Sequence, residues 1–220
     1  YFSGASGGLA LAESKPSMLS MPFSPAEKVW IASHPVVKIA IDPEFSPFEF
    51  FSESGEYSGM GADYVERISE ILGIRFEVVK NISWRQAVSM AEKKDIDALP
   101  CVGISEKRKE HFLFSKPYLA FPRVIVTRTV SPVHTIEDLK NKSVAVQAKS
   151  SHHEYIKEKT RITPILFDTF KDALLSVSRG ENEAAIGNLA VATDTMGRLN
   201  LTNLKIAGHT SKDVSSLAFA

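Results

Sequence analysis

The sequence predicts an α/β protein whose two lobes pack around a cleft. Strand and helix patterns alternate over two stretches of the chain, 36–117 and 122–208. Such alternation is typical of βα units, with largely parallel or mixed sheets and helices on both faces. The stretches are separated near Lys116-Pro117-Tyr118, and each is small for an independent domain. We therefore expect two lobes that pack as one body around a cleft.

The first lobe is predicted over 36–117, and the family resemblance given below implies that 214–220 completes it. Its expected strands are rich in β-branched residues, and apolar side chains recur at helical spacing between them. Gly73 follows the first helical stripe, where a C-terminal cap is expected, and Gly55 marks a turn. The Pro- and Phe-rich segment 42–51 is expected to be a loop. The predicted strands are 36–41, 74–79 and 96–100, and the helical stripes are 65–72 and 84–91.

The second lobe is predicted over 122–208 and continues the same alternation. Its expected strands are 124–129, 143–147, 163–167, 184–187 and 204–207. Helices are expected over 151–158, 170–177 and 188–196, with a capped helical turn over 135–139. A final strand is expected over 216–220.

The N-terminal part of the chain differs from both lobes. Residues 1–22 are rich in Gly and Ser and contain an Ala-x-Ala pattern, so we interpret them as a leader remnant or linker. Residues 23–35 are expected to form a lead-in helix. Ser24 and Glu27 have the spacing of a capping box, Pro25 suits the first helical position, and the helix should end before His34-Pro35.

Composition excludes several functional classes. Acidic and basic residues balance at 26 each, which argues against a nucleic-acid partner. The single cysteine, Cys101, rules out an intramolecular disulfide, and no run approaches the roughly 20 apolar residues of a membrane span. We find no zinc spacing, phosphate-binding Gly loop, Gly-x-Ser-x-Gly elbow or dinucleotide fingerprint. We therefore expect no cofactor, no metal and no catalytic residue.

Three segments carry residues suited to binding a small anion. Segment 42–50 follows a buried strand and carries aromatic residues that could line a pocket or, alternatively, fill the core of the lobe. In 103–109, Arg108 has the planar geometry that matches a carboxylate, although the segment could also be a solvated charge run. The Lys149-Ser150-Ser151 segment precedes a helix, whose N-terminus suits an anion, although an ordinary N-cap explains it equally well.

His152, His153 and Cys101 are interpreted as non-catalytic. Adjacent histidines on a helix point in different directions, so they would not chelate a metal together, and we expect both to face solvent. Cys101 is expected to be a small apolar residue close to the cleft.

Several motifs in a fixed order resemble the bacterial periplasmic binding proteins for polar amino acids, solute-binding family 3. The similarity covers residue 36 to the end of the chain. It rests on VKIAIDPEFSPFEF at 37–50, GMGADY at 59–64, DIDAL at 95–99, GISEKRK at 103–109, FLFSKPY at 112–118 and AAI at 184–186. The resemblance implies a two-lobed type II periplasmic-binding-protein fold that closes on its ligand by hinge bending.

The resemblance also implies roles for individual residues. Phe45 and Trp84 would be the aromatic walls around the ligand, and Asp42 an acidic contact from the first lobe. Arg108, helped by the backbone near Gly103, would hold the ligand carboxylate. Ser150 and Ser151 would reach the same carboxylate from the second lobe.

Three positions depart from the family pattern. Asn188 stands where an Asp usually pairs with the ligand ammonium group, and an amide cannot neutralise that charge. Lys149 replaces a small glycine and would add positive charge at the cleft, and Gly103 stands where a hydroxyl residue is common. We therefore expect a ligand more anionic than a plain α-amino acid, such as a mono- or dicarboxylate.

The lead-in at 24–35 resembles the segment that precedes such modules in membrane sensor kinases. This favours a periplasmic sensor domain of a membrane-anchored histidine kinase, with a small carboxylate or amino acid as ligand and a homodimer assembled through the receptor. One alternative is the substrate-binding protein of an ABC amino-acid transporter. Another is a dehydratase or lytic transglycosylase on the same fold, whose acid would come from Asp42, Glu44 or Glu49.

Overall fold

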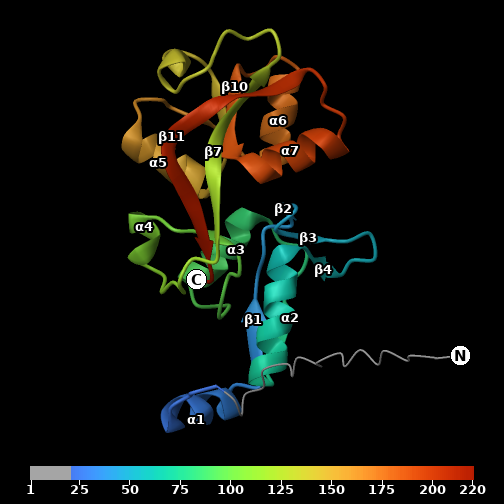
Figure 1. Cartoon of the computed structure of the whole chain (residues 1–220), viewed down its shortest axis with the longest axis vertical. Helices are drawn as coiled ribbons and strands as arrows, with labels where there is room; N and C mark the ends of the chain where they lie inside the picture. Colours follow the sequence, from blue (N-terminus) through green and yellow to red (C-terminus); the bar gives the residue numbers. More distant parts are fainter. Residues whose placement is uncertain (1–20) are drawn as a thin grey trace, which may run out of the picture.

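The computed structural model describes residues 21–220, apart from the side chains of residues 212 and 213. Figure 1 shows two lobes joined by two long strands, β7 (Leu119–Arg128) and β11 (Leu204–Ala218). We use "lobe 1" for residues 36–117 with 214–220, and "lobe 2" for residues 122–208. The arrangement confirms the predicted two-lobed α/β fold. The predicted leader or linker, 1–22, lies outside the described residues except for Met21 and Pro22.

The lead-in helix α1 (Pro25–Ser33) forms at the free end of lobe 1 (Figure 1). Its capping box is present: Ser24 Oγ accepts from the Glu27 amide, and Glu27 accepts from the Ser24 amide at 2.7 Å. The helix ends at Ser33, and the ring of the C-cap residue His34 stacks on Trp30 at a centroid distance of 4.2 Å. Ile31 is its buried residue and joins the core of lobe 1.

Lobe 1 is built on β1 (Val36–Ile39), which pairs in parallel with β5 (Arg75–Val78). Two helices follow the pattern read from the sequence: α2 (Met60–Leu72), which ends on a left-handed Gly73, and α3 (Trp84–Glu92), which has a capping box from Ser83. The remaining elements are β2 (Glu44–Phe45), β3 (Glu49–Phe51), β4 (Tyr57–Ser58), β6 (Val102–Gly103) and α4 (Glu106–Lys109).

Lobe 2 contains most of a six-stranded mixed sheet in the order β6-β11-β7-β10-β8-β9. Strands β8 (Val144–Gln147), β9 (Ile165–Phe167) and β10 (Ala184–Asn188) run parallel, whereas β7 is antiparallel to both of its neighbours. Its helices are α5 (Ser151–Lys159), α6 (Phe170–Ser178), α7 (Leu189–Arg198) and the short 3-10 helix η2 (Glu137–Leu139). The carboxyl ends of β8 and β10 lead directly into α5 and α7, which places both helix N-termini at the junction between the lobes.

The two long strands make the connection between the lobes. β7 and β11 pair antiparallel from Leu204–Arg128 in lobe 2 to Leu217–Leu119 in lobe 1. Their register shifts between Ile206 and Gly208 and again between His209 and Val214. Such irregularities bend a strand and raise its local twist, which lets one strand serve both lobes.

A continuous apolar cluster runs through this junction. Phe48, Cys101 and Leu217 from lobe 1 pack with Val126, Phe170 and other side chains of lobe 2. Phe48 is fully buried and lies 4.4 Å from Phe121 of β7 between ring centroids. The lobes therefore share part of their core around the crossing strands.

Three sequence expectations need correction. Segment 96–100 forms only an isolated bridge between Ala98 and Ile39, because the Asp97 carboxylate accepts the Lys38 amide that a longer ladder would use. Segment 42–51 is not entirely loop, since β2 and β3 pair within it. The two strands predicted over 204–207 and 216–220 are parts of the single strand β11, which ends at Ala218.

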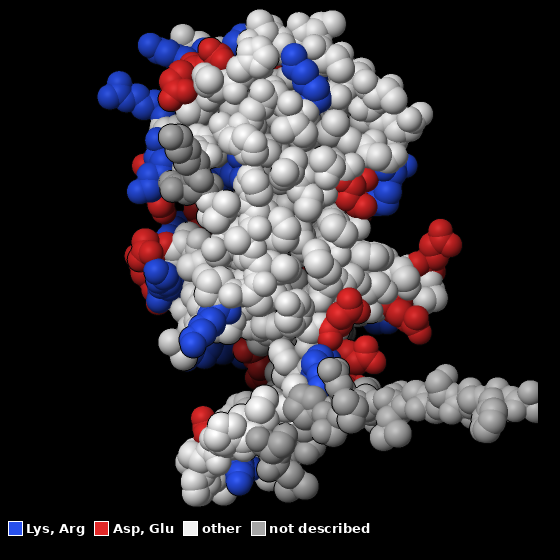
Figure 2. Space-filling model, in the orientation of Figure 1, with Lys and Arg blue, Asp and Glu red and all other residues white. Residues whose placement is uncertain are grey.

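The surface carries charges of both signs, as expected for zero net charge. Figure 2 shows Lys and Arg interspersed with Asp and Glu along the edges of the molecule, with a largely uncharged face between them. Among residues 21–220, no helix is both long enough and apolar enough to span a bilayer.

Candidate functional site

A pocket lies at the junction of the lobes and is lined from both sides. Lobe 1 contributes residues from the loop after β1, from β2, α3, β6 and α4, and from the end of β11, and lobe 2 contributes the ends of β8 and β10 and the start of α5. The lining residues are Asp42, Phe45, Trp84, Cys101, Gly103, Arg108, Gln147, Ser150, Ser151, His152, Asn188, Ser215 and Leu217. Nine of the ten residues predicted for the site are in this set, and the exception is Lys149. Their role in ligand binding stays a prediction.

Two aromatic side chains form the lobe 1 walls. Trp84 begins α3 and is buried, and its Nε1 donates to the main-chain oxygen of Lys149 in lobe 2 at 3.1 Å. Phe45 lies at the end of β2 and contacts Phe48 at a centroid distance of 5.0 Å. The Phe-rich segment therefore does both things considered from the sequence, since Phe48 fills the core and Phe45 lines the pocket.

Arg108 is the buried cation of the pocket, with 4% of its surface exposed. Its guanidinium lies 5.8 Å from the Trp84 ring centroid. Nε donates to Glu154 of α5 at 3.1 Å, Nη1 to the Gly103 oxygen at 2.8 Å and Nη2 to the Lys149 oxygen. Burial lowers the pKa of Arg108, and the Glu154 carboxylate opposes that shift. Three of the five guanidinium N–H donors are thus engaged within the protein.

Asp42 connects the lobes at another point of the pocket. It is buried, and it accepts from Gln147 Nε2 of lobe 2 at 2.8 Å and from the Glu44 amide at 3.1 Å. Burial raises its pKa to about 6, and the hydrogen bond from Gln147 moderates the rise. A carboxyl group that titrates this close to neutrality is poised to respond to ligand charge and to pH.

The other two carboxylates considered for an enzyme do not line the pocket. Glu49 is fully buried behind it, where it accepts the Asp42 amide at 2.9 Å, and burial raises its pKa well above the usual range. Glu44 is half-buried and pairs with Lys171. Of the three candidate acids, only Asp42 faces the pocket, so the pocket lacks a matched carboxylate pair of the kind that glycoside hydrolysis uses.

The start of α5 presents two hydroxyls with different availability. Ser150 is the N-cap: its Oγ accepts from the His153 amide at 3.1 Å and donates to the Gln147 oxygen at 2.7 Å. Ser151 Oγ has no hydrogen-bond partner among the described side chains and faces Gly103, where an added Cβ would lie 2.5 Å from it. Ser151 is therefore the hydroxyl that is free to meet a ligand.

Lys149 does not line the pocket, and its charge lies on the rim. The residue adopts a left-handed backbone with φ of 60°, which explains why a glycine would suit this position. Its Nζ lies 3.3 Å from Glu92 of lobe 1, and its side chain is about half exposed. The expected positive charge at the cleft therefore becomes a cross-lobe ion pair at the surface.

The expectation that both histidines face solvent is wrong for His152. Its side chain is only 7% exposed and lines the pocket, where Nδ1 accepts from Arg123 Nε at 3.0 Å. Burial, together with the charges of Arg123 and Arg108, lowers the pKa of His152 well below its usual range. A partner 29 residues away, on β7, keeps this ring inside the protein.

Asn188, Cys101 and Gly103 complete the predicted set. Asn188 is the buried N-cap of α7, and its Oδ1 accepts from the amides of Ala190 and Val191. Cys101 is buried 3.0 Å from the Tyr118 hydroxyl, and burial raises the pKa of its thiol, which is the opposite of what a nucleophile requires. Gly103 packs against Ser151 and supplies the oxygen that orients Arg108.

Four lining residues were missed by the sequence reasoning: Gln147, His152, Ser215 and Leu217. Gln147 ends a strand whose other residues are apolar, so a polar residue at that carboxyl end was the available signal. Ser215 and Leu217 lie on β11 after its shifts in register, so the alternation of residues along the strand does not predict which way their side chains point.

Direct contacts hold the two lobes close together. Among the described side chains, four ion pairs cross between them: Arg108–Glu154, Arg85–Asp168, Lys149–Glu92 and Lys171–Glu44. The pocket volume is about 30 Å³, room for only two or three waters at about 10–15 Å³ each. A solute of amino-acid size therefore requires the lobes to separate or the lining side chains to move.

The donor set does not suggest a metal. Within residues 21–220, no group of three His, Cys, Asp or Glu side chains is arranged to hold an ion. The pocket instead combines one buried guanidinium, one buried carboxyl, hydroxyls, amides and an aromatic wall. This combination suits a small polar organic molecule.

A hinged pair of lobes with a polar pocket between them defines a ligand-binding protein of the Venus flytrap class. Residues 37–206 match the bacterial extracellular solute-binding proteins of family 3, and the chain belongs to this family.

Two groups of curated relatives are similar in sequence. The virulence sensor protein BvgS of Bordetella pertussis is 24% identical over 90% of this chain, which corresponds to 16% of that relative. The amino-acid-binding protein AabA of Dichelobacter nodosus is 28% identical over 81% of this chain and 72% of that relative. The chain therefore spans about a sixth of the length of BvgS.

Solved structures confirm the fold. The arginine-bound form of truncated ArgBP from T. maritima superposes with a TM-score of 0.76 at 28% identity, covering 87% of this chain and 90% of that one. The BvgS periplasmic VFT2 domain of Bordetella pertussis has a TM-score of 0.78 at 23% identity, covering 90% of this chain and 85% of that one.

Proposed function

We propose that this chain is the periplasmic ligand-binding domain of a membrane-bound signalling receptor, a sensor histidine kinase, and that its lobes close on a small carboxylate or amino-acid-like ligand. The observation that carries the proposal is the polar pocket between the lobes, in which a buried guanidinium from one lobe meets hydroxyl and amide groups from the other. Closing around a solute would bury it between these groups, and differential affinity for the open and closed arrangements would shift their balance.

Three observations support a sensor. The BvgS relatives are sensor proteins by name, and the similarity spans 90% of this chain. A histidine kinase sensor domain described as similar to periplasmic binding proteins superposes with a TM-score of 0.78 over 84% of the chain. The capped helix α1 ahead of lobe 1 suits a module joined to a preceding segment. On this proposal the parent protein is anchored in a membrane, and a homodimer would form through the receptor.

A transport role is the second candidate. AabA and ArgBP are amino-acid- and arginine-binding proteins by name, and the chain covers 72% and 90% of them respectively. The gene would distinguish the roles, since a reading frame continuing into membrane and kinase segments supports sensing and a neighbouring permease gene supports transport.

The binding itself is tested by titrating the protein with amino acids and small carboxylates in a calorimeter, together with small-angle X-ray scattering. We expect saturable binding of at least one solute and a change in the radius of gyration on binding. A protein that binds no solute from either class, with an unchanged radius throughout, would refute the proposed function.

A further inference from the structure

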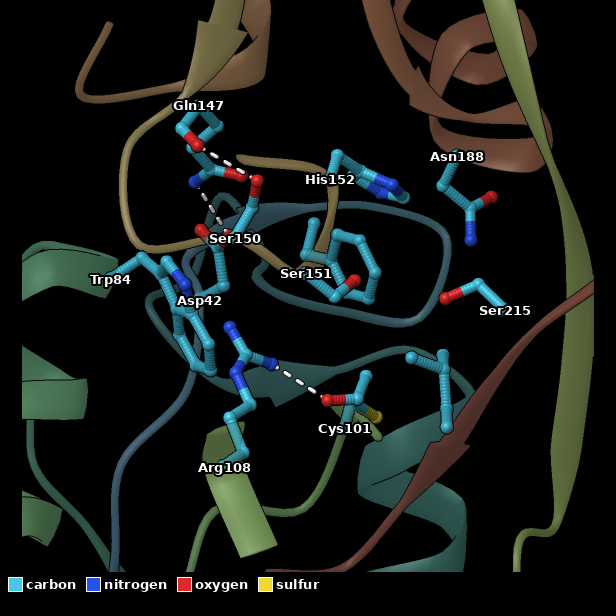
Figure 3. A pocket seen from close by; sticks show the side chains of 13 residues that line it. Asp42, Trp84, Cys101, Arg108, Gln147, Ser150, Ser151, His152, Asn188 and Ser215 are labelled. Atoms are coloured by element: carbon cyan, nitrogen blue, oxygen red, sulfur yellow. Dashed lines mark hydrogen bonds between the residues drawn. The ribbon is translucent and has the colours of Figure 1, made fainter. Parts of the chain in front are cut away.

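The part of the pocket formed by lobe 2 contains two side chains that present N–H donors, His152 and Asn188, beside the hydroxyls of Ser150 and Ser151 and the amide of Gln147. Figure 3 shows the His152 ring pointing toward Asn188, whose amide nitrogen points toward Ser215, whereas Asp42 lies on the opposite side near Trp84. His152 and Asn188 are 7% and 3% exposed. We call these two residues the donor pair.

The amide of Asn188 can turn only one way. Its Oδ1 accepts from the Ala190 amide at 2.8 Å and the Val191 amide at 3.4 Å, which are unpaired donors of the first turn of α7. Nitrogen at that position would set donor against donor, so the hydrogen-bond network fixes the assignment. The NH₂ group therefore turns toward Ser215 and the pocket (Figure 3).

The ring of His152 is also restricted to one form. Arg123 Nε is a donor that cannot accept, and it lies 3.0 Å from His152 Nδ1. Nδ1 must therefore be unprotonated, so the hydrogen is on Nε2, the remaining ring nitrogen. The position of Arg123 is supported in turn by the Tyr155 ring, whose centroid lies 4.0 Å from the guanidinium carbon.

Because both side chains present N–H donors, this side of the pocket should prefer a ligand group that accepts hydrogen bonds. A carboxylate, carbonyl or hydroxyl oxygen placed between them would accept hydrogen bonds from Asn188 Nδ2 and His152 Nε2. An ammonium group at the same place would instead point its own N–H donors at these two donors. Buried donors facing donors are costly because neither is satisfied.

We propose, on the basis of the proposed solute-binding function, that the donor pair selects small carboxylates whose second polar group accepts hydrogen bonds and rejects the ammonium group of α-amino acids. The ligand class is thus a 2-oxo or 2-hydroxy acid, with its carboxylate toward Ser151 and the remaining N–H donors of Arg108. Asp42 stays paired with Gln147 and Glu44 on the far side of the pocket.

The test uses ligands that differ only at the carbon next to the carboxylate. Calorimetry compares pyruvate, L-lactate and L-alanine, then oxaloacetate, L-malate and L-aspartate, then 2-oxoglutarate, 2-hydroxyglutarate and L-glutamate. In the set that binds, the oxo or hydroxy acid should bind about tenfold or more tightly than the amino acid, because a hydrogen bond to a charged group is replaced by an unsatisfied donor pair.

The decisive variant is Asn188→Asp. Aspartate is as good an N-cap as asparagine, so α7 should be retained, which circular dichroism checks. The variant replaces the NH₂ donor by a carboxylate oxygen, so it should weaken oxo and hydroxy acids about tenfold and strengthen the matching amino acid. Ser24→Asp adds the same charge at the exposed N-cap of α1, far from the pocket, and should leave the ratio unchanged.

The outcomes separate the two proposals. Tighter binding of the amino acid by the wild-type protein, or a preference that Asn188→Asp changes by less than about twofold, overturns the selectivity inference and leaves solute binding intact. If neither the wild-type protein nor the variant binds any member of the three sets, the proposed solute-binding function fails and the inference fails with it.

Discussion

The buried ion pair between Arg108 and Glu154 should be a main stabilising contact between the lobes, and Glu154→Gln tests it. The substitution keeps the size of the side chain and removes its charge. Arg108 is 4% exposed, the Glu154 side chain is 14% exposed, and their closest atoms are 3.1 Å apart. Removing one partner of a buried pair typically costs about 3–5 kcal/mol, because the other charge is left uncompensated.

The expected loss lies at the lower end of that range. Glu154 keeps some contact with solvent, and the charge of Glu92 also acts on Arg108. We therefore expect a loss of about 3 kcal/mol in the free energy of unfolding, which lowers the melting temperature of a domain of this size by about 6–12 °C. Separation of the lobes would let water reach Arg108 and reduce this loss, so the radius of gyration must be measured as well.

The assay combines thermal unfolding followed by circular dichroism with small-angle X-ray scattering. The control is Glu181→Gln, which removes the charge of an exposed pair with Arg179, whose side chains are 56% and 54% exposed. That variant should stay within about 0.5 kcal/mol of the wild-type protein. The reasoning is refuted if Glu154→Gln melts within about 2 °C of wild type and keeps the same radius of gyration.

Three other predictions follow from single contacts. Burial raises the pKa of Asp42 from 3.8 to about 6, so its contribution to the free energy of unfolding is present near pH 4 and is lost as the pH rises through about 6. In urea titrations at several pH values, Asp42→Asn should remove up to about 3 kcal/mol of the decline in unfolding free energy over this pH range. Parallel pH profiles of the variant and the wild-type protein would contradict this. Gly187→Ala would bring a Cβ into collision with the Phe170 ring and should lower the free energy of unfolding by about 1–3 kcal/mol. The control is Gly197→Ala on α7, where an added Cβ has no neighbour within 4 Å, so this variant should be neutral or stabilising. Equal melting temperatures of the two variants would be inconsistent with this packing. Trp84→Phe keeps the aromatic wall but removes the Nε1 hydrogen bond to lobe 2 and should cost about 0.5–1.5 kcal/mol in chemical denaturation; no loss would mean that the bond does not form in solution.

Much of the fold was predictable because its elements carry strong local signals. The capping box at Ser24 and the C-terminal cap at Gly73 mark helix ends that the structure reproduces. The strands of lobe 2 were also located well, because their apolar runs alternate with helical stripes. Segment 96–100 failed because the carboxylate of Asp97 competes for a backbone donor, which apolar patterning does not reveal.

The candidate site was less predictable, because its contacts join distant segments. Glu154 lies on a weakly amphipathic helix, where no local pattern marks it as a site residue. It nevertheless pairs with the guanidinium of Arg108, 46 residues away in the sequence. His152 was read as exposed because its partner Arg123 comes from another strand. Lys149 was expected to add positive charge at the cleft, but its ammonium group pairs with Glu92 at the surface, and only its main-chain oxygen contacts the pocket residues Trp84 and Arg108.

The paired strands β7 and β11 restrict how the lobes can move. A single connecting strand would permit the lobes to twist in any direction. Two paired strands confine the motion mainly to a rotation about the axis through the two points where β7 and β11 pass between the lobes. The irregular register between His209 and Val214 lies between the lobe 2 and lobe 1 parts of β11, and we expect the backbone torsion changes of that rotation to occur there. Solutes of different shape would therefore cause the same rotation of one lobe relative to the other, but by different angles. The angle between the lobes, rather than the direction of the rotation, would distinguish one bound solute from another.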